Sequence, residues 1–213
     1  SPEGRQKSIK FLQDAIEKLP NNPQLYSYLG VALAQTNNVT GAITANLNVL
    51  SLQPGNISAM RNLVLLYRSQ GKAQDALQTA EKALSILGSN NVAETKQFRQ
   101  LEAEIYQAAG QTDQVIAQYE QIRQLDPKDV TALQNLSNLY LSAQNLTKVI
   151  EVSQTLMGLE PQNYKHPLMA AQAMQKLGQA DNARKLAEQA LALAPADQKP
   201  SIQQFIASLQ KGG

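Results

Sequence analysis

The chain of 213 residues contains no cysteine and no tryptophan, and His166 is its one histidine. Without cysteine it cannot form a disulfide framework, a thiolate metal site or a cysteine nucleophile. One histidine is too few for a usual zinc site, so we expect no metal and no cofactor. His166 precedes Pro167, and this context predicts a loop or the start of a helix rather than a catalytic residue.

Charge is also scarce, because only 17% of the residues are charged and the formal net charge is +2. The chain has no run of Lys or Arg, which argues against binding to nucleic acid or to an anionic membrane.

No apolar stretch approaches the roughly 18 residues of a membrane span, so direct membrane insertion of this chain is not expected. The sequence starts at Ser1 instead of Met, so we expect a trimmed chain, and an export signal or anchor could have stood upstream. The compartment is left open.

Amide side chains take the place of the missing charge. The chain has 28 Gln and 15 Asn, and they supply much of its polar surface. Apolar residues make up 43% of the chain, an ordinary fraction that argues against disorder. These features predict a folded chain with an amide-rich surface.

Prolines recur at a fixed interval at the ends of helix-like segments. The series comprises Pro20, Pro54, Pro127, Pro161 and Pro195, and three of its intervals are equal in length. Gly88 stands where one proline of the series is missing. The distance from Gly88 to Pro127 exceeds the common interval by five, which predicts a five-residue insertion near residues 91–95. This insertion either lengthens the next helix or forms a loop. A fixed period of about 34 residues indicates a repeat architecture.

The repeats also share large residues, small residues, tyrosines and turn glycines at corresponding positions, although not every repeat contains all of them. The matches in the first three repeats include Tyr26, Leu29, Gly30, Ala42, Leu63, Tyr67, Gly71, Ala76, Ala103, Tyr106 and Gly110. The fourth and fifth include Leu136, Tyr140, Gly178, Ala183 and Ala190. This pattern resembles the tetratricopeptide repeat, a unit of two antiparallel helices, over about residues 8–195. It departs from the family in having no Trp at the first large position.

The resemblance implies an all-α fold, a right-handed α–α superhelix of about five repeats in one solenoid over residues 1–213. The expected repeats cover 23–56, 57–90, 96–129, 130–163 and 164–197. Their helix pairs are 23–36 with 39–52, 57–70 with 73–87, 93–109 with 112–125, 130–143 with 146–158, and 164–177 with 180–193. A lone helix at 2–18 precedes them. A capping helix at 199–210 follows, with Ile202, Phe205, Ile206 and Leu209 facing the fifth pair.

Residue patterns for catalysis are nearly absent, so we expect no enzyme. A modest group of carboxylates comprises Glu94, Glu102, Glu104, Asp113 and Glu120. They are interpreted as a solvated face, because Glu102 lies at helical spacing from Arg99 and no glycine-rich loop completes a site. Asn-x-Ser/Thr triplets begin at Asn38, Asn56, Asn135 and Asn145 and are interpreted as chance matches to the glycosylation motif.

In the tetratricopeptide family, partners bind on the concave surface formed by the first helix of each pair. The resemblance places these residues there: Arg61, Asn62, Arg68, Gln97, Gln100, Glu104, Gln134, Asn135, Asn138 and Gln172. It also places Val31 and Leu65 on this surface. Asn62 and Asn135 occupy positions where the family uses Asn to bond a peptide backbone, and repeat packing is the equally weighted alternative. Arg61 and Arg68 lie seven residues apart and could face one acidic group; solvated surface arginines are the alternative.

The sequence therefore predicts a non-enzymatic module that binds a protein or peptide segment, one with acidic residues, in a concave groove. No repeat pairs a cation with an amide in the way needed to clamp a terminal carboxylate. The alternative is a scaffold or assembly factor that acts by self-association or through its convex face. RNA binding is not expected, because few basic and no stacking residues line the groove.

Overall fold

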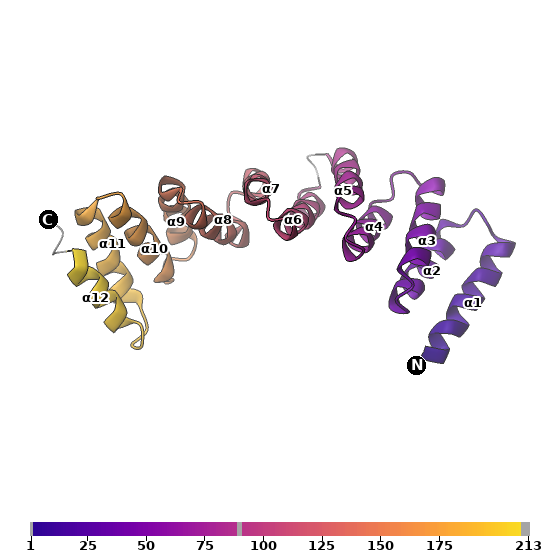
Figure 1. Ribbon diagram of the computed structural model, residues 1–213, viewed down its shortest axis with the longest axis horizontal. Helices are drawn as coiled ribbons and strands as arrows, with labels where there is room; N and C mark the ends of the chain where they lie inside the picture. The colour runs from indigo at the N-terminus through magenta and orange to yellow at the C-terminus, as the bar shows by residue number, and fades with distance from the viewer. Residues whose placement is uncertain (1, 89–90, 210–213) are drawn as a thin grey trace. The chain divides into compact units, whose positions relative to one another are not determined.

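The computed structural model describes residues 2–88 and 91–209. Within these residues all regular structure is helical (Figure 1). The helices are α1 (Pro2–Lys18), α2 (Pro23–Gln35), α3 (Val39–Leu52), α4 (Ile57–Ser69), α5 (Ala73–Leu87), α6 (Val92–Ala108), α7 (Thr112–Leu125), α8 (Val130–Ser142), α9 (Leu146–Leu159), α10 (Lys165–Lys176), α11 (Ala180–Leu193) and α12 (Lys199–Leu209). Every helix begins and ends within one residue of the bounds expected from the sequence. Ser89 and Asn90, which end the second expected repeat, and Gln210, which ends the expected capping helix, lie outside the described residues.

The chain divides into two compact units, Ser1–Gln111 and Thr112–Gly213, here called unit 1 and unit 2. In unit 1, α2 packs with α3 and α4 with α5, while α1 and α6 pack at either end of this stack. In unit 2, α8 packs with α9 and α10 with α11, while α7 and α12 pack at the ends. The unit boundary falls between α6 and α7, the two helices assigned to the third pair. The single solenoid over 1–213 therefore stays a prediction, and each unit is described by itself.

Polar residues start many of these helices by bonding free backbone N–H groups. The side-chain oxygens of Asn38, Asn56 and Asn145 accept from the third residue of α3, α4 and α9 at 2.9 to 3.3 Å. Each of these asparagines also begins one of the Asn-x-Ser/Thr triplets. Capping satisfies an N–H that has no partner inside the helix. The asparagines of three of the four triplets thus have a structural role as helix caps, whereas Asn135 lies within α8.

The helices of a pair are joined by a residue in the left-handed conformation. Gly71, Gly110 and Gly178 have φ between 69° and 74°, as the turn glycines of the repeat were expected to have. Asn37, with φ of 60°, takes this place in the first repeat, and Gln144, with φ of 55°, takes it in the fourth. The turn geometry is therefore retained where the glycine is missing.

The five-residue insertion lengthens a helix. Helix α6 has 17 residues, whereas α2, α4 and α8 have 13 each. The extra residues extend the N-terminal end of α6. Of the two alternatives for the insertion, a longer helix or a loop, the longer helix is therefore the one observed. Phe98 of α6 is fully buried in a cluster with Met60 and Val64 of α4, which anchors the extended helix.

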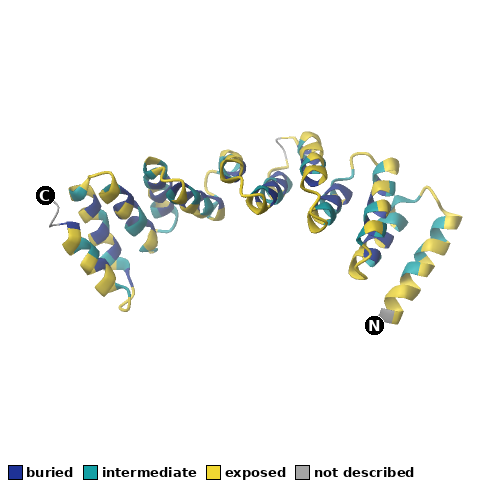
Figure 2. Cartoon of the chain, in the orientation of Figure 1, coloured by how far each residue is buried: buried dark blue, intermediate teal, exposed yellow. Residues whose placement is uncertain are grey.

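In both units the helices bury apolar residues against their neighbours, except for α1, whose apolar residues are at most half-buried (Figure 2). In unit 2, Leu133, Leu136, Val149 and Leu156 form the centre of one such cluster. Helix α12 packs on α11 and buries Ile202 and Leu209, with Phe205 and Ile206 half-buried. The apolar stripe expected for the capping helix therefore faces the protein.

Candidate functional site

An open pocket lies on the first-helix face of unit 1. Its volume is about 300 Å³, and its lining residues are Gly30, Val31, Ala34 and Gln35 of α2, Asn46 of α3, and Asn62, Leu65 and Leu66 of α4. Val31 is 49% exposed and Leu65 is 39% exposed, although both are large apolar residues. Their apolar surface facing solvent makes this pocket a candidate site for an apolar side chain.

The polar wall of the pocket is a short chain of amides. Asn46 is buried, and its Nδ2 donates to the Ala42 carbonyl oxygen at 2.8 Å. Its Oδ1 accepts from Nδ2 of Asn62 at 3.2 Å, which holds the Asn62 amide in one orientation. A Cβ atom at Gly30 would lie 2.8 Å from Nδ2 of Asn46, so glycine allows this close approach of α2. The local packing thus orients an amide at the edge of an apolar pocket.

The two arginines expected in the groove each pair with a separate carboxylate of α6. Arg61 Nη2 lies 3.4 Å from Glu94 Oε1, and the Arg61 guanidinium lies 5.7 Å from the centre of the Phe98 ring. Arg68 Nη1 pairs with Oε2 of Glu104. Each arginine thus has its own carboxylate within the chain, and the idea that both face one acidic group of a partner stays a prediction.

Helix α6 completes the first-helix face of unit 1. Gln97 and Glu104 are exposed and Gln100 is half-buried. Glu102, on the same helix, is only 2% exposed and pairs with Arg99 at 3.0 Å. The interpretation of this carboxylate as part of a solvated face is wrong. Burial raises the pKa of Glu102, and the nearby Arg99 opposes that rise.

The first-helix face of unit 2 is polar. A pocket of about 270 Å³ brings together two of the predicted residues, Gln134 and Asn138 of α8. Its remaining lining residues are Ser137, Leu156, Asn163, Lys165, His166 and Met169. Asn135 is half-buried, and its Nδ2 donates to the carbonyl oxygen of Thr131 in its own helix at 2.9 Å. Gln172 of α10 is exposed and does not line this pocket.

His166 lies in the first turn of α10, where the sequence placed a helix start. It is 7% exposed, and its Nε2 lies 2.6 Å from Oε2 of Glu160. Gln134 and Asn163 donate to the same oxygen at 3.3 and 3.1 Å. The hydrogen bond from His166, followed by that from Asn163, lowers the pKa of Glu160. This group joins the α9–α10 connection to α8.

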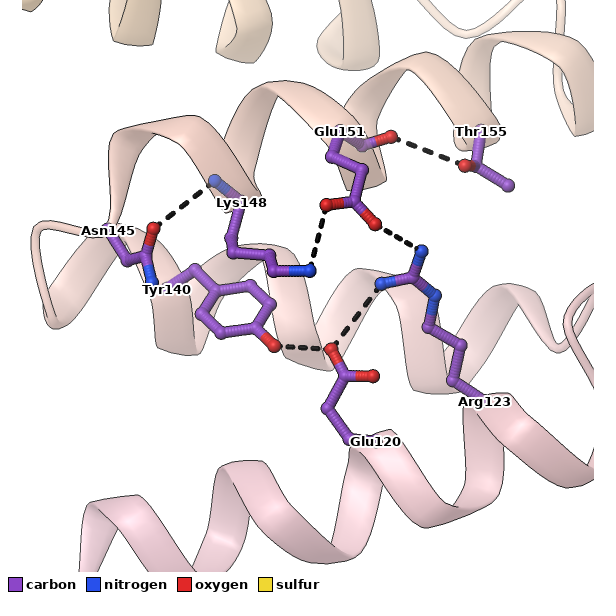
Figure 3. Close-up of polar contacts among 7 residues, drawn as sticks. All are labelled: Glu120, Arg123, Tyr140, Asn145, Lys148, Glu151 and Thr155. Atoms are coloured by element: carbon purple, nitrogen blue, oxygen red, sulfur yellow. Dashed lines mark hydrogen bonds and ion pairs between the residues drawn. The ribbon is translucent and has the colours of Figure 1, made fainter.

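A second polar network links α7, α8 and α9 within unit 2 (Figure 3). Arg123 bridges two carboxylates, with Nη1 at 3.4 Å from Glu120 and Nη2 at 2.6 Å from Glu151. The hydroxyl of Tyr140 donates to Glu120, and Lys148 lies 2.9 Å from Glu151. Burial and the bond to Glu120 raise the pKa of Tyr140. Every ionic group of this network is paired, so it is suited to hold the three helices together.

Neither a metal cluster nor a membrane span was found in the described part of the chain. Residues 2–88 and 91–209 contain no group of three or more His, Cys, Asp or Glu side chains that could hold a metal ion. No helix in these ranges is long and apolar enough to cross a membrane.

Sequence reasoning named Val31 and Leu65 but did not single them out as the core of the site. They are separated by one repeat period and are both apolar at a position expected on the surface. This repetition is the sequence feature that could have identified them as the centre of the site. Asn46, which lies on a second helix, carried no such signal, because its contact with Asn62 depends on how α3 packs against α4.

No family model matches the chain. The human PEX5-related protein is 35% identical over 69 residues, which is 32% of this chain and 11% of that protein. The rat PEX5-related protein is 26% identical over 136 residues, covering 64% of this chain and 20% of that protein. The chain thus spans a fifth or less of the length of these curated relatives.

Solved structures similar to the chain have the same fold. YrrB, described as a tetratricopeptide protein with an unusual peptide-binding site, has a TM-score of 0.61 and 14% identity, with 91% of this chain and 97% of YrrB covered. MamA has a TM-score of 0.58 and 19% identity, with 84% of this chain and 94% of MamA covered. Yeast Tom70 has a TM-score of 0.50 and 18% identity over 95% of this chain and 42% of Tom70. The repeat period, the paired helices and these similarities together show that the chain has the fold of tetratricopeptide-repeat proteins.

Proposed function

We propose that the chain is a protein-interaction module and that the first-helix face of unit 1 binds a segment of a partner protein. The observation that carries this proposal is the open apolar pocket between α2 and α4, with Val31 and Leu65 exposed at its edge. An apolar side chain of the partner would fill this pocket. Burying apolar surface of this kind is the main favourable contribution to such an association.

The oriented amide of Asn62 supports an extended backbone as the ligand. An amide both donates and accepts hydrogen bonds, which matches the pattern of a peptide unit. Because Asn46 holds the Nδ2 side of Asn62, the Oδ1 side is left to accept from a partner N–H. Gln97 and Gln100 of α6 extend the polar part of this surface. The peptide-binding site for which YrrB is described agrees with a role of this class.

The remaining predicted residues form a separate candidate surface on unit 2. Gln134 and Asn138 line its pocket, and Asn135 and Gln172 lie on the same first helices. We assign them to polar contacts with a partner segment. This surface would bind through hydrogen bonds more than through apolar burial, since exposed amides dominate it.

Introducing negative charge at the pocket tests the proposal. Ligands of the full chain would be selected from a random-peptide display library, and their affinities measured by titration calorimetry. Val31→Glu with Leu65→Glu should weaken binding at least tenfold, because each introduces a charge where an apolar side chain is buried. Ile86→Glu is the matched control, since Ile86 is 46% exposed on a second helix of the same unit. Equal losses in both variants, or crosslinks confined to α3 and α5, would refute binding at the first-helix face.

One observation favours the scaffold alternative. Helix α1 packs Ile9, Leu12 and Ile16 against the cluster of Leu29 and Leu33 in unit 1 but leaves Phe11 72% exposed. Association of chains through α1 would bury this ring. Sedimentation over a hundredfold range of concentration should then show association that Phe11→Ser abolishes. A monomer at all concentrations would exclude self-association through α1.

A further inference from the structure

We infer that Glu94 and Glu104 make the first-helix face of unit 1 select against acidic partner segments, in favour of uncharged or basic segments with an apolar side chain. This inference rests on the proposed function and reverses the acidic preference expected from Arg61 and Arg68 alone. The two carboxylates occupy both arginines of the face, as an acidic ligand would otherwise do.

The pairing cancels the positive charge of α4 by the negative charge of α6. Arg61 pairs with Glu94, 33 residues later, and Arg68 with Glu104, 36 residues later. Both pairs therefore join α4 to α6, the first helices of adjacent repeats. Two positive and two negative groups thus lie on one face with no net charge among them.

The carboxylates are the more exposed members of both pairs. The Glu94 side chain is 43% exposed against 31% for Arg61, and Glu104 is 53% exposed against 38% for Arg68. A partner segment that approaches this face therefore meets negative charge first. An acidic side chain is repelled there, whereas a basic or neutral one is tolerated.

Arg61 is poorly placed to leave Glu94 for a ligand. Its guanidinium lies over the Phe98 ring at 5.7 Å, and Phe98 is fully buried in the core. Its Nε is buried and has no hydrogen-bond partner within the described residues. To reach an incoming carboxylate, the side chain would have to give up the ring contact as well as its ion pair.

These ion pairs are better suited to recognition than to stability. Pairs that are this exposed contribute little to folding, because water and salt screen the attraction and two long side chains must be ordered. A like charge placed opposite a partner discriminates between ligands even when its own pair stabilises the fold weakly. Selectivity is therefore the effect to measure.

The test compares a neutral peptide and its single-aspartate version on the full chain. The neutral peptide is the tightest uncharged ligand from the display selection used to test the proposed function. Wild type should bind the aspartate version at least fivefold more weakly. Glu94→Gln with Glu104→Gln should reduce that difference at least threefold. The control is Asp75→Asn with Glu81→Gln, which changes the charge of unit 1 equally from α5 and should leave the difference unchanged.

Three outcomes would overturn the inference. Wild type could bind the aspartate version as well as the neutral peptide, the selection could return mainly acidic ligands, or the two double variants could behave alike. If Val31→Glu with Leu65→Glu still abolishes binding in these cases, the proposed function stands and only the charge selection is wrong. If that variant binds normally, or no ligand is selected, the proposed function is wrong and the inference falls with it.

Discussion

Units 1 and 2 repeat the same helical pair but place their ionic contacts on different helices. In unit 1, Arg61 and Arg68 of α4 pair with carboxylates of α6, so these contacts join first helices. In unit 2, Arg123 of α7 pairs with Glu151 of α9, which joins two helices assigned as second helices. The repeat therefore determines which helices meet without determining where charge is located.

This difference leaves the two units with different first-helix faces. Unit 1 presents an apolar pocket beside neutralised charges, whereas unit 2 presents amides beside a carboxylate held by His166. The core positions of both units are alike, since small and aliphatic residues recur there at the repeat period. Under the proposed function, binding specificity would therefore depend on the variable surface positions rather than on the shared core.

Loss of the capping helix should give the largest difference between the units. Deletion of residues 198–213 exposes the surface of α11 that α12 covers, including the contacts of Ile202, which is 1% exposed. Each fully buried aliphatic side chain contributes about 1.5–3 kcal/mol, so unit 2 should lose several kcal/mol and associate. Hydrogen exchange followed by mass spectrometry should show faster opening of α10 and α11, with α2 to α5 unchanged. Unchanged exchange in α11 would show that α12 is not a cap.

A valine at position 30 should destabilise unit 1 alone. Gly30→Val forces the buried Asn46 amide to move, because even a Cβ atom would lie 2.8 Å from it, and overpacking costs about 1–3 kcal/mol. Val64 occupies the same repeat position one period later and is fully buried, so the demand for glycine comes from Asn46 and not from the fold. Ser137→Ala, at the corresponding position in unit 2, is the control and should cost less than about 1 kcal/mol. Urea titration of both variants measures these costs.

Removal of one hydroxyl should weaken the network of unit 2 by a smaller amount. Tyr140→Phe deletes the donor to Glu120 and should cost about 0.5–1.5 kcal/mol in the free energy of unfolding. Tyr106→Phe in unit 1 is the control, because no hydrogen bond of its hydroxyl is found in the described residues, and it should be nearly neutral. Thermal unfolding followed by circular dichroism compares the two. Equal shifts of the thermal midpoint in the two variants would mean that the hydrogen bond of Tyr140 does not contribute to stability.

The smallest effects concern pH, and the two units should respond with opposite signs. The pKa of Glu160 is lowered from 4.5, so its stabilisation is present above that value and is lost as pH falls through the lowered pKa. The pKa of Glu102 is raised from 4.5, so the folded state holds its proton longer and stability falls as pH rises between the two values. Urea midpoints of Glu160→Gln below pH 4.5 should depend less on pH than those of wild type. Wild type should lose stability as the pH rises above 4.5 because of Glu102, and the Glu102→Gln variant should not show this loss. If both substitutions changed the pH dependence of the urea midpoint in the same direction, these assignments would be contradicted.

Some features of this protein follow from its sequence alone because they depend on neighbours a few residues apart. The helix bounds and the left-handed turn glycines are set by spacings of three or four residues and by backbone preferences, whereas the Asn caps were not predicted. The regular spacing of the prolines then indicates the repeat, and the stripe of Ile202 and Leu209 indicates the last helix. The position of the insertion was also readable, although its outcome, a longer α6, was one of two alternatives.

Tertiary structure decided the charges and the pocket. Sequence spacing put Glu102 beside Arg99 on a helix surface, but only the packing of α6 shows that this carboxylate is buried. Sequence spacing also indicated no partner for Arg61 or Arg68, because Glu94 and Glu104 reach these arginines only when α4 and α6 lie side by side. The pocket depends in the same way on Asn46 of α3 meeting Asn62 of α4. Helical periodicity is a local property, whereas burial and ion pairing depend on which helices meet, and that is set by the packing of whole repeats.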